Sequence, residues 1–160
     1  MPQRNNRPLD VVICTDGSTT GRLGPGAWAA ILVFGTHEKE ISGYIPDGVG
    51  NGRMELMAVC EGLKALKRAC RVRVISDSEY VVKGINTWLE SVWVKKGWRT
   101  NSGKEPKHRD LWEQILYYKK IHDIEAVWER GHSGHHLNER ADKIARGLRE
   151  RHKNASNASA

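Results

Sequence analysis

The chain of 160 residues contains only three cysteines, and none of its apolar runs is long enough to cross a membrane. Cys14, Cys60 and Cys70 form no CxxC pair and no pairing framework, which predicts reduced, buried thiols. A membrane span needs about 20 apolar residues, and residues 1–7 lack the apolar core of a signal peptide. We therefore expect a cytoplasmic monomer with no disulfide framework and no membrane partner.

Acidic residues are scarcer than basic ones. Lys and Arg outnumber Asp and Glu by 26 to 19, which gives a formal net charge of +7. This excess predicts a polyanionic partner, but charge alone does not separate nucleic acid from an acidic membrane surface. A merely solvated basic surface would give the same count, so only sequence motifs can distinguish these interpretations.

The hydrophobic pattern predicts one α/β domain over residues 9–152, between flexible tails at 1–8 and 153–160. The expected strands cover residues 11–15, 28–34, 38–45, 72–76 and 126–129. The expected helices cover residues 56–70, 79–92, 111–120 and 137–152. Three consecutive strands followed by alternating helices and strands indicate a mixed five-stranded sheet. Its first three strands should be antiparallel, with helices on both faces of the sheet.

Four carboxylates occupy positions that could converge on one edge of this sheet. Asp16 and Asp77 end strands, Glu55 begins a helix, and Asp142 lies within the last helix. A cluster of unpaired acids normally holds cations, and oxygen ligands favour Mg²⁺ or Mn²⁺. Two such ions about 4 Å apart can promote phosphoryl transfer. Each acid taken alone also fits a solvated turn, cap or helix position, so spacing leaves both interpretations open.

Five sequence segments, in order along the chain, carry more specific motifs. They are Cys14–Ser18 with Gly21, Gly24 and Gly26, Asn51–Ala58, Ser76–Val81, Trp128–His135, and Asn138–Asp142. Together they resemble the motifs of the type 1 ribonuclease H family, in its bacterial form. The resemblance implies the ribonuclease H-like fold. It also implies Mg²⁺-dependent hydrolysis of the RNA strand of RNA/DNA hybrids, which leaves 5′-phosphate and 3′-hydroxyl ends with little base specificity.

The resemblance also implies roles for individual residues. Asp16 would bridge two Mg²⁺ ions, for which Mn²⁺ is a possible substitute, and Glu55, Asp77 and Asp142 would complete their ligand shells. His132 would be the mobile histidine beside the site, where it assists proton transfer or product release. A zinc site formed by the neighbouring histidines is the alternative, but their spacing matches no common zinc pattern.

A basic segment at about 93–109 interleaves tryptophans with cations. Its cations are Lys95, Lys96, Arg99, Lys104, Lys107 and Arg109. Such residues make sequence-independent phosphate contacts, and aromatic rings can pack on a sugar or base. Trp88 fits a core position. Trp93 and Trp98 fit either the core or a binding role, and together with Lys95 and Lys96 they are predicted to contact the substrate. The segment resembles the basic protrusion of bacterial type 1 enzymes, which implies contact with the DNA strand.

Four further residues are predicted to contact the substrate because they match family positions. They are Gly17, Ser18, Asn51 and Asn138. The first three should lie near RNA 2′-hydroxyls, the group that separates RNA from DNA.

Several positions depart from the family pattern. Gly50 and Gly52 stand where Thr and Asn are common, Arg22 replaces a frequent Asn, and Glu79 replaces a frequent Gln. We hypothesise that Arg22 and Glu79 lie close and offset each other. The alternatives to a stand-alone hybrid nuclease are a non-catalytic hybrid-binding module, a DNA-directed nuclease of the same superfamily, and a domain excised from a reverse transcriptase. The intact acids argue against a pure binding module, because clustered negative charge hinders the binding of a polyanion.

Overall fold

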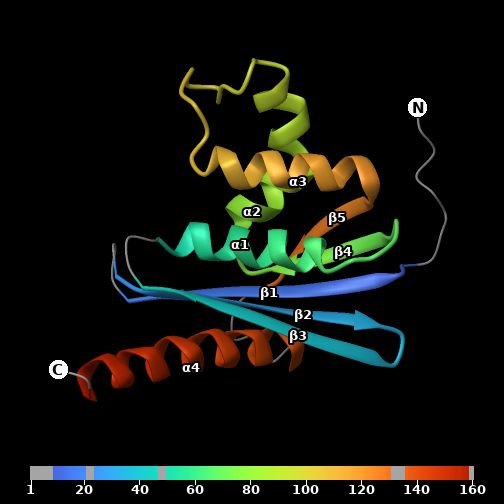
Figure 1. The fold of residues 1–160 in the computed structure, drawn as a ribbon. Helices are drawn as coiled ribbons and strands as arrows, with labels where there is room; N and C mark the ends of the chain where they lie inside the picture. Colours follow the sequence, from blue (N-terminus) through green and yellow to red (C-terminus); the bar gives the residue numbers. More distant parts are fainter. Residues whose placement is uncertain (1–8, 21–23, 47–49, 131–135, 159–160) are drawn as a thin grey trace.

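A five-stranded mixed sheet forms the centre of the protein (Figure 1). The computed structural model describes residues 9–20, 24–46, 50–130 and 136–158. The strands are β1 (Val11–Thr19), β2 (Gly26–Phe34), β3 (His37–Ile45), β4 (Arg71–Ser76) and β5 (Asp123–Trp128). Their order is β3-β2-β1-β4-β5, with β1, β2 and β3 antiparallel and with β4 parallel to both β1 and β5. The predicted mixed sheet with an antiparallel first half is confirmed.

Helices cover both faces of this sheet, as the sequence predicts. They are α1 (Asn51–Lys64), α2 (Glu79–Lys83), the π-helix η1 (Gly84–Val94), α3 (Arg109–Ile121) and α4 (His136–Ala158). In Figure 1, α1, α2 and α3 lie above the sheet and α4 lies below it. None of the helices in the described part of the chain has the length and apolar character of a membrane span.

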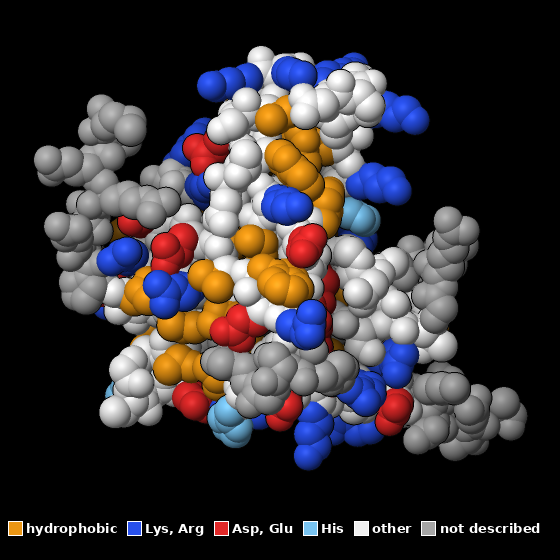
Figure 2. Space-filling view, turned by 180° about the vertical axis from the view of Figure 1, so that it is seen from behind, with side chains coloured by type: hydrophobic (Ala, Val, Ile, Leu, Met, Phe, Trp, Pro, Cys, Tyr) orange, Lys and Arg blue, Asp and Glu red, His pale blue; other side chains and the backbone are white. Residues whose placement is uncertain are grey.

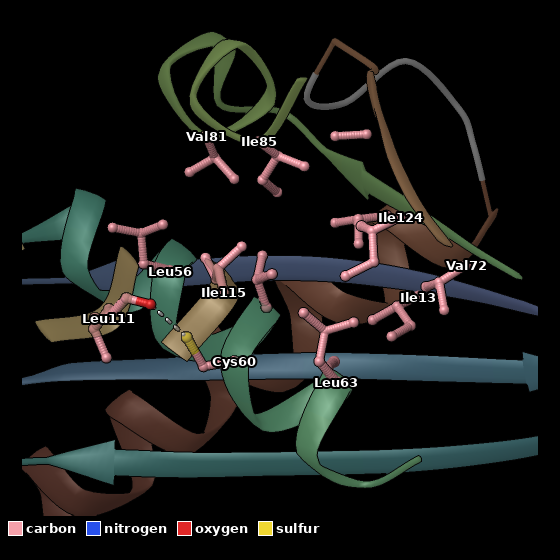
Figure 3. Close-up of a cluster of buried hydrophobic side chains, with 14 of the residues drawn as sticks. Ile13, Leu56, Cys60, Leu63, Val72, Val81, Ile85, Leu111, Ile115 and Ile124 are labelled. Carbon is pink, nitrogen blue, oxygen red and sulfur yellow. Dashed lines mark hydrogen bonds between the residues drawn. The ribbon is translucent and has the colours of Figure 1, made fainter. Parts of the chain in front are cut away.

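The main core lies between the sheet and the α1–α3 side. Ile13, Leu56 and Ile115 come from a strand and two different helices and meet there with no exposed surface (Figure 3). A smaller cluster on the other face packs Ile31 against Ala141 of α4. The strands alternate between these two clusters because successive side chains of a strand point to opposite faces. All three cysteines are buried and free, as expected.

The segment after α2 differs from the single helix that the sequence predicts over residues 79–92. The chain widens at Gly84 into a π-helix, an arrangement that often marks a site of strain or function. A Cβ at position 84 would lie 2.2 Å from the ring of Trp112. The side chain of Asn86 also donates to and accepts from the backbone of Ala126, at 2.8 and 2.9 Å. These tertiary contacts, which periodicity does not encode, set the local helix geometry.

The last helix also differs from its predicted end. It continues to Ala158, whereas the sequence predicts an end at His152 followed by a flexible tail. Extending a helix that already exists costs far less than starting one. The alanines of this stretch have high helix propensity, so low complexity was a poor guide to the helix end.

Two glycine-to-alanine substitutions should change the free energy of unfolding in opposite directions. Gly84→Ala forces a methyl group into the Trp112 ring, so we expect a loss of about 1–3 kcal/mol. Gly147→Ala adds a methyl group on α4 that meets nothing within 4 Å beyond its own stretch of helix backbone among the described residues, so we expect a gain of about 0.5–1 kcal/mol. Urea unfolding of both variants measures the difference, and a Gly84→Ala protein as stable as the natural one would contradict this packing.

Candidate active site

Three of the four predicted carboxylates meet at one edge of the sheet. Asp16 lies on β1, Asp77 directly follows β4, and Glu55 lies on α1 above them. One oxygen from each side chain lies within 4.8 Å of the others, and Asp16 and Glu55 are only 4% and 1% exposed. The parallel pairing of β1 with β4 extends to Cys14 and Ile75 and so places Asp16 beside Asp77, although β1 continues to Thr19 and does not end before Asp16 as predicted. The convergence expected from the strand-end positions is therefore present for these three acids.

Gly17 fixes the approach of α1 to β1 at this site. Its backbone N–H donates to Oε1 of Glu55 at 2.9 Å. A Cβ at position 17 would lie 2.7 Å from Cβ of Met54 and 2.9 Å from the backbone nitrogen of Glu55. Only a residue without a side chain allows this close contact. Gly17 thus orients the carboxylate of Glu55 with its backbone.

The second oxygen of Glu55 shows that the site fits a cation. Oε2 is buried and has no hydrogen-bond partner among the residues that the structure describes. A buried unpartnered carboxylate oxygen is costly, and a hard cation compensates that cost directly. Asp16 and Asp77 supply further oxygens within reach, and an all-oxygen set suits Mg²⁺ or Mn²⁺.

The acidity of these groups reflects their burial and their mutual repulsion. Burial, together with the nearby charges of Asp77 and Asp142, raises the pKa of Asp16 to about 7. Burial, followed by the charge of Asp16, raises the pKa of Glu55 well above its ordinary value. Without a cation, the cluster therefore favours bound protons near neutral pH. A divalent cation at the same place would favour the ionised forms instead.

Asp142 lies beside the three-acid group without being part of it. It projects from α4 and influences Asp16 through a hydrogen bond and through its charge. Its carboxylate forms an ion pair with Arg146, one turn later on the same helix. Asp142 is thus positioned to join the cluster, while Arg146 offsets its charge.

Two residues of this site were missed because sequence analysis gave them no role of their own. Glu129 directly follows β5. Burial raises the pKa of the Cys14 thiol to about 12, and the negative charge of Glu129 is the second largest cause of this increase. Trp128 ends β5 and donates its indole N–H to the backbone carbonyl of Asp77 at 2.9 Å. An acid directly after a parallel strand was the signal used for Asp77 after β4. The same signal could have identified Glu129 after β5.

Two predictions concern residues outside the described part of the chain. His132 lies there, so its proximity to the acids stays a prediction. Arg22 lies there as well, and its pairing with Glu79 stays a hypothesis. Glu79 itself lies 3.9 Å from Lys83 on the same helix, where the pair is exposed and weakly stabilising.

The predicted substrate-contacting residues differ in exposure. Asn51 is exposed at the first position of α1, and Ser18 is half-buried on β1. Asn138 is buried, with its side-chain nitrogen 3.5 Å from the carbonyl oxygen of Arg130. Asn138 thus contacts the residue Arg130 that follows β5, and its predicted contact with the substrate stays a prediction.

The basic protrusion (residues 93–109) requires one correction. Trp93 is only 4% exposed, and its ring packs edge-on against Trp112 at a centroid distance of 5.0 Å. It belongs to the core and cannot stack on nucleic acid as predicted, because η1 turns its ring inward. Trp98 is half-buried, with the guanidinium of Arg109 lying 5.0 Å from its ring centroid.

The lysines of the protrusion remain available at the surface, whereas Arg109 forms ion pairs with Glu105 and Glu113. Lys95 and Lys96 are exposed, and Lys96 donates to the side chain of Asn101 at 2.8 Å. Figure 2 shows Lys and Arg side chains around the upper part of the molecule, where the protrusion lies. The protrusion therefore presents positive charge rather than aromatic faces.

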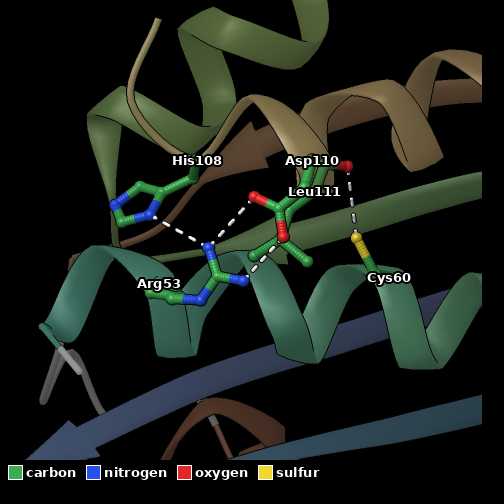
Figure 4. Close-up of polar contacts among 5 residues, drawn as sticks. All are labelled: Arg53, Cys60, His108, Asp110 and Leu111. Atoms are coloured by element: carbon green, nitrogen blue, oxygen red, sulfur yellow. Dashed lines mark hydrogen bonds and ion pairs between the residues drawn. The ribbon is translucent and has the colours of Figure 1, made fainter. Parts of the chain in front are cut away.

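Arg53 connects the protrusion to the helix that carries Glu55. Its guanidinium binds both carboxylate oxygens of Asp110, at 3.1 and 2.6 Å, and lies 3.4 Å from Nδ1 of His108 (Figure 4). Hydrogen bonding from Arg53 lowers the pKa of Asp110, while burial and the Arg53 charge lower that of His108. This fork-shaped contact joins the start of α1 to the start of α3 and so fixes the protrusion relative to the carboxylates.

Comparison with known proteins gives consistent matches over most of the chain. Residues 8–149 match the family model described as RNase H. The chain is 51% identical to the Ribonuclease H of Hahella chejuensis over 135 residues, covering 84% of this chain and 90% of that protein. It is 46% identical to the Ribonuclease HI of Caulobacter vibrioides over 141 residues, covering 88% of this chain and 93% of that protein.

A solved structure gives a similar result. LC9-RNase H1, a type 1 RNase H with the type 2 active-site motif, superposes with a TM-score of 0.77 at 27% identity. The match covers 91% of this chain and 74% of the other. The three acids lie within the residues that match the family model.

Proposed function

The chain belongs to the ribonuclease H family of endonucleases, which are hydrolases, and we propose that it cleaves the RNA strand of RNA/DNA hybrids. The observation that carries this proposal is the group of three carboxylates, Asp16, Glu55 and Asp77, with the unpartnered oxygen of Glu55 inside it. In a protein with a net charge of +7, such a buried acidic group needs a cation, and a cation beside a polyanion suits phosphoryl transfer.

The proposed reaction uses Mg²⁺, with Mn²⁺ as a substitute. Two bound ions would lower the pKa of an attacking water and stabilise the leaving oxygen. Asp16, which interacts with the other three acids, would contact both ions, while Glu55, Asp77 and Asp142 would complete the ligand set. The oxygen of water forms a bond to phosphorus as the bond to the ribose 3′-oxygen breaks, which leaves a 5′-phosphate and a 3′-hydroxyl. We propose that His132 assists proton transfer or product release.

Substrate binding would involve two surfaces. The cations of the basic protrusion would contact phosphates of the DNA strand without reading bases. Gly17, Ser18 and Asn51 would lie near 2′-hydroxyls of the RNA strand, which selects RNA at the cutting position. This division predicts little base specificity. Cytoplasmic location and action as a monomer stay predictions of the sequence.

A substrate panel tests the proposed function. Labelled RNA/DNA hybrid, duplex RNA, single-stranded RNA and duplex DNA are each incubated with the protein and Mg²⁺, with and without EDTA. We expect cutting of the hybrid alone, in its RNA strand, and complete loss of cutting with EDTA. Equal cutting of duplex DNA would favour a DNA-directed nuclease, and hybrid binding without cutting would favour a non-catalytic module; either result would overturn the proposal.

The lysines of the protrusion should contribute to affinity by neutralising phosphates. Removing one lysine that neutralises a phosphate should reduce the slope of log affinity against log salt concentration by about 0.9 for a duplex. We therefore expect Lys95→Ala and Lys96→Ala each to lower the slope by up to about this amount, equally for hybrids of different sequence. Fluorescence anisotropy with labelled hybrid in EDTA measures the slope. Lys120→Ala, an exposed lysine at the far end of α3, is the control, and equal slopes for all proteins would contradict the expectation.

A further inference from the structure

Trp128 is exposed although it is one of the largest apolar side chains of the protein. It ends β5 with 42% of its surface exposed, and it belongs to none of the hydrophobic clusters formed by the described residues. An exposed indole contributes little to core packing. Its position therefore requires another explanation.

The indole nitrogen of Trp128 donates to the backbone carbonyl of Asp77 at 2.9 Å. The regular pairing of β4 with β5 ends one residue earlier, where Ser76 faces Trp128. The next backbone hydrogen bond runs from the N–H of Glu129 to the carbonyl of Ser76 at 3.0 Å. It therefore also binds Ser76 and not Asp77. Asp77 thus lies just beyond the ladder, and the indole bond extends the connection between the two strands to Asp77 itself.

Asp77 needs such an anchor because its carboxylate faces two other acids. Its side chain is half-buried and lies within 4.8 Å of oxygens of Asp16 and Glu55. Repulsion between these like charges favours rotation of Asp77 toward solvent whenever no cation is bound. The side chain of Ser78 caps the next helix, so Asp77 is the single residue between the end of β4 and this cap.

We propose that Trp128 is a positioning residue for Asp77, which it holds in the metal-ligating arrangement through the indole hydrogen bond. The inference rests on the proposed metal site, and it assigns Trp128 no contact with the reacting atoms. We therefore expect the affinity for Mg²⁺ to depend on the indole of Trp128, although this ring contributes little to core packing.

The indole N–H of Trp128 gives a direct test in the natural protein. The sequence has six tryptophans, and the signal that disappears from the ¹H–¹⁵N spectrum of Trp128→Phe identifies the one from position 128. When Mg²⁺ is added, we expect this signal and the amide of Gly17, which binds Glu55, to shift with the same midpoint. The indole of Trp112, which donates to Tyr80 at 3.2 Å within the core, should not move.

The Trp128→Phe variant tests the same bond by removing it. Phenylalanine keeps an aromatic ring but has no N–H, so we expect the Mg²⁺ affinity reported by Gly17 to fall about fivefold, the size of one neutral hydrogen bond. Hybrid cleavage should fall at low Mg²⁺ and recover at high Mg²⁺. Trp98→Phe, the same chemical change within the protrusion, should leave the Mg²⁺ affinity unchanged.

The possible outcomes separate this inference from the proposed function. If Gly17 responds to Mg²⁺ but the indole of Trp128 does not, or if Trp128→Phe binds Mg²⁺ with natural affinity, the positioning role is wrong and the metal site stands. If Gly17 does not respond to Mg²⁺ in the natural protein, the metal site fails and the inference fails with it.

Discussion

Replacing Asp16 with Asn should lower Mg²⁺-dependent cleavage of RNA/DNA hybrid by about a thousandfold. Asp16 interacts with Glu55, Asp77 and Asp142 and is only 4% exposed, so we expect that no other acid can take its place. The substitution keeps the shape of the side chain but removes its negative charge. A loss of about 4 kcal/mol of transition-state stabilisation corresponds to this factor. Initial rates at saturating Mg²⁺ measure it.

The matched control for this substitution is Asp123→Asn. Asp123 is an exposed acid at the start of β5, the strand that ends beside the candidate site. It should retain the natural rate, because its charge is far from the carboxylate group. Hybrid binding by Asp16→Asn in EDTA should persist, since the protrusion is unchanged. A rate for Asp16→Asn within tenfold of the natural protein would contradict the assignment.

Without metal, the free energy of unfolding should fall as the pH rises from about 4 to about 7. Burial raises the pKa of Asp16 from an ordinary 3.8 to about 7 in the folded state, and that of Glu55 is also raised. Between these values the unfolded chain loses its protons while the folded chain keeps them. The stabilising contribution is thus complete below about pH 4 and is lost as the pH approaches 7. For Asp16 it is on the order of 4 kcal/mol, at about 1.4 kcal/mol per pKa unit.

The Asp16→Asn protein provides the comparison for this pH dependence. Asn does not titrate, so the variant should unfold at higher urea concentration than the natural protein at pH 7 in EDTA, and the two should converge near pH 4. Mg²⁺ should then stabilise the natural protein but not the variant, because it binds only the folded acidic group. Asp110, whose pKa Arg53 lowers, contributes in the opposite direction, but it does so equally in both proteins. Parallel pH profiles for the two would contradict the prediction.

The sheet and three acids of the site could be predicted because local pattern determines them. In each of β1 and β4 an apolar stretch is followed by an acid, and the parallel pairing of the two strands brings these acids to the same edge. Glu55 could be placed because helical periodicity begins near it and the motif around it is specific. Short-range rules were therefore sufficient for Asp16, Glu55 and Asp77.

The rest of the site depends on contacts between segments that are distant in sequence. Whether Trp93 stacks on nucleic acid or packs on Trp112 depends on the π-helical turn after Gly84, and that turn depends on Trp112 itself. The bond from Trp128 to Asp77 joins the last residue of β5 to the residue that follows β4. Neither contact follows from the periodicity or composition of one segment.

The contact that connects the protrusion to the acids could not be predicted from one sequence segment either. Arg53 could be recognised as part of a motif, but its partner Asp110 lies at the start of α3, and the two meet only in the folded structure. Because Arg53 is two residues from Glu55, this ion pair joins the predicted binding surface to the predicted metal site. Both surfaces can be predicted from the sequence, but the contact that places them relative to each other cannot.

The binding of Mn²⁺ to the free protein tests the central claim most directly. Electron paramagnetic resonance counts free Mn²⁺ as the natural protein, Asp16→Asn, Glu55→Gln and the control Asp123→Asn are titrated without nucleic acid. If Asp16, Glu55 and Asp77 hold the divalent cation, the natural protein and Asp123→Asn bind Mn²⁺ alike, and the other two bind it at least about tenfold more weakly. Equal binding by all four proteins would show that the cation site lies elsewhere and would contradict the account.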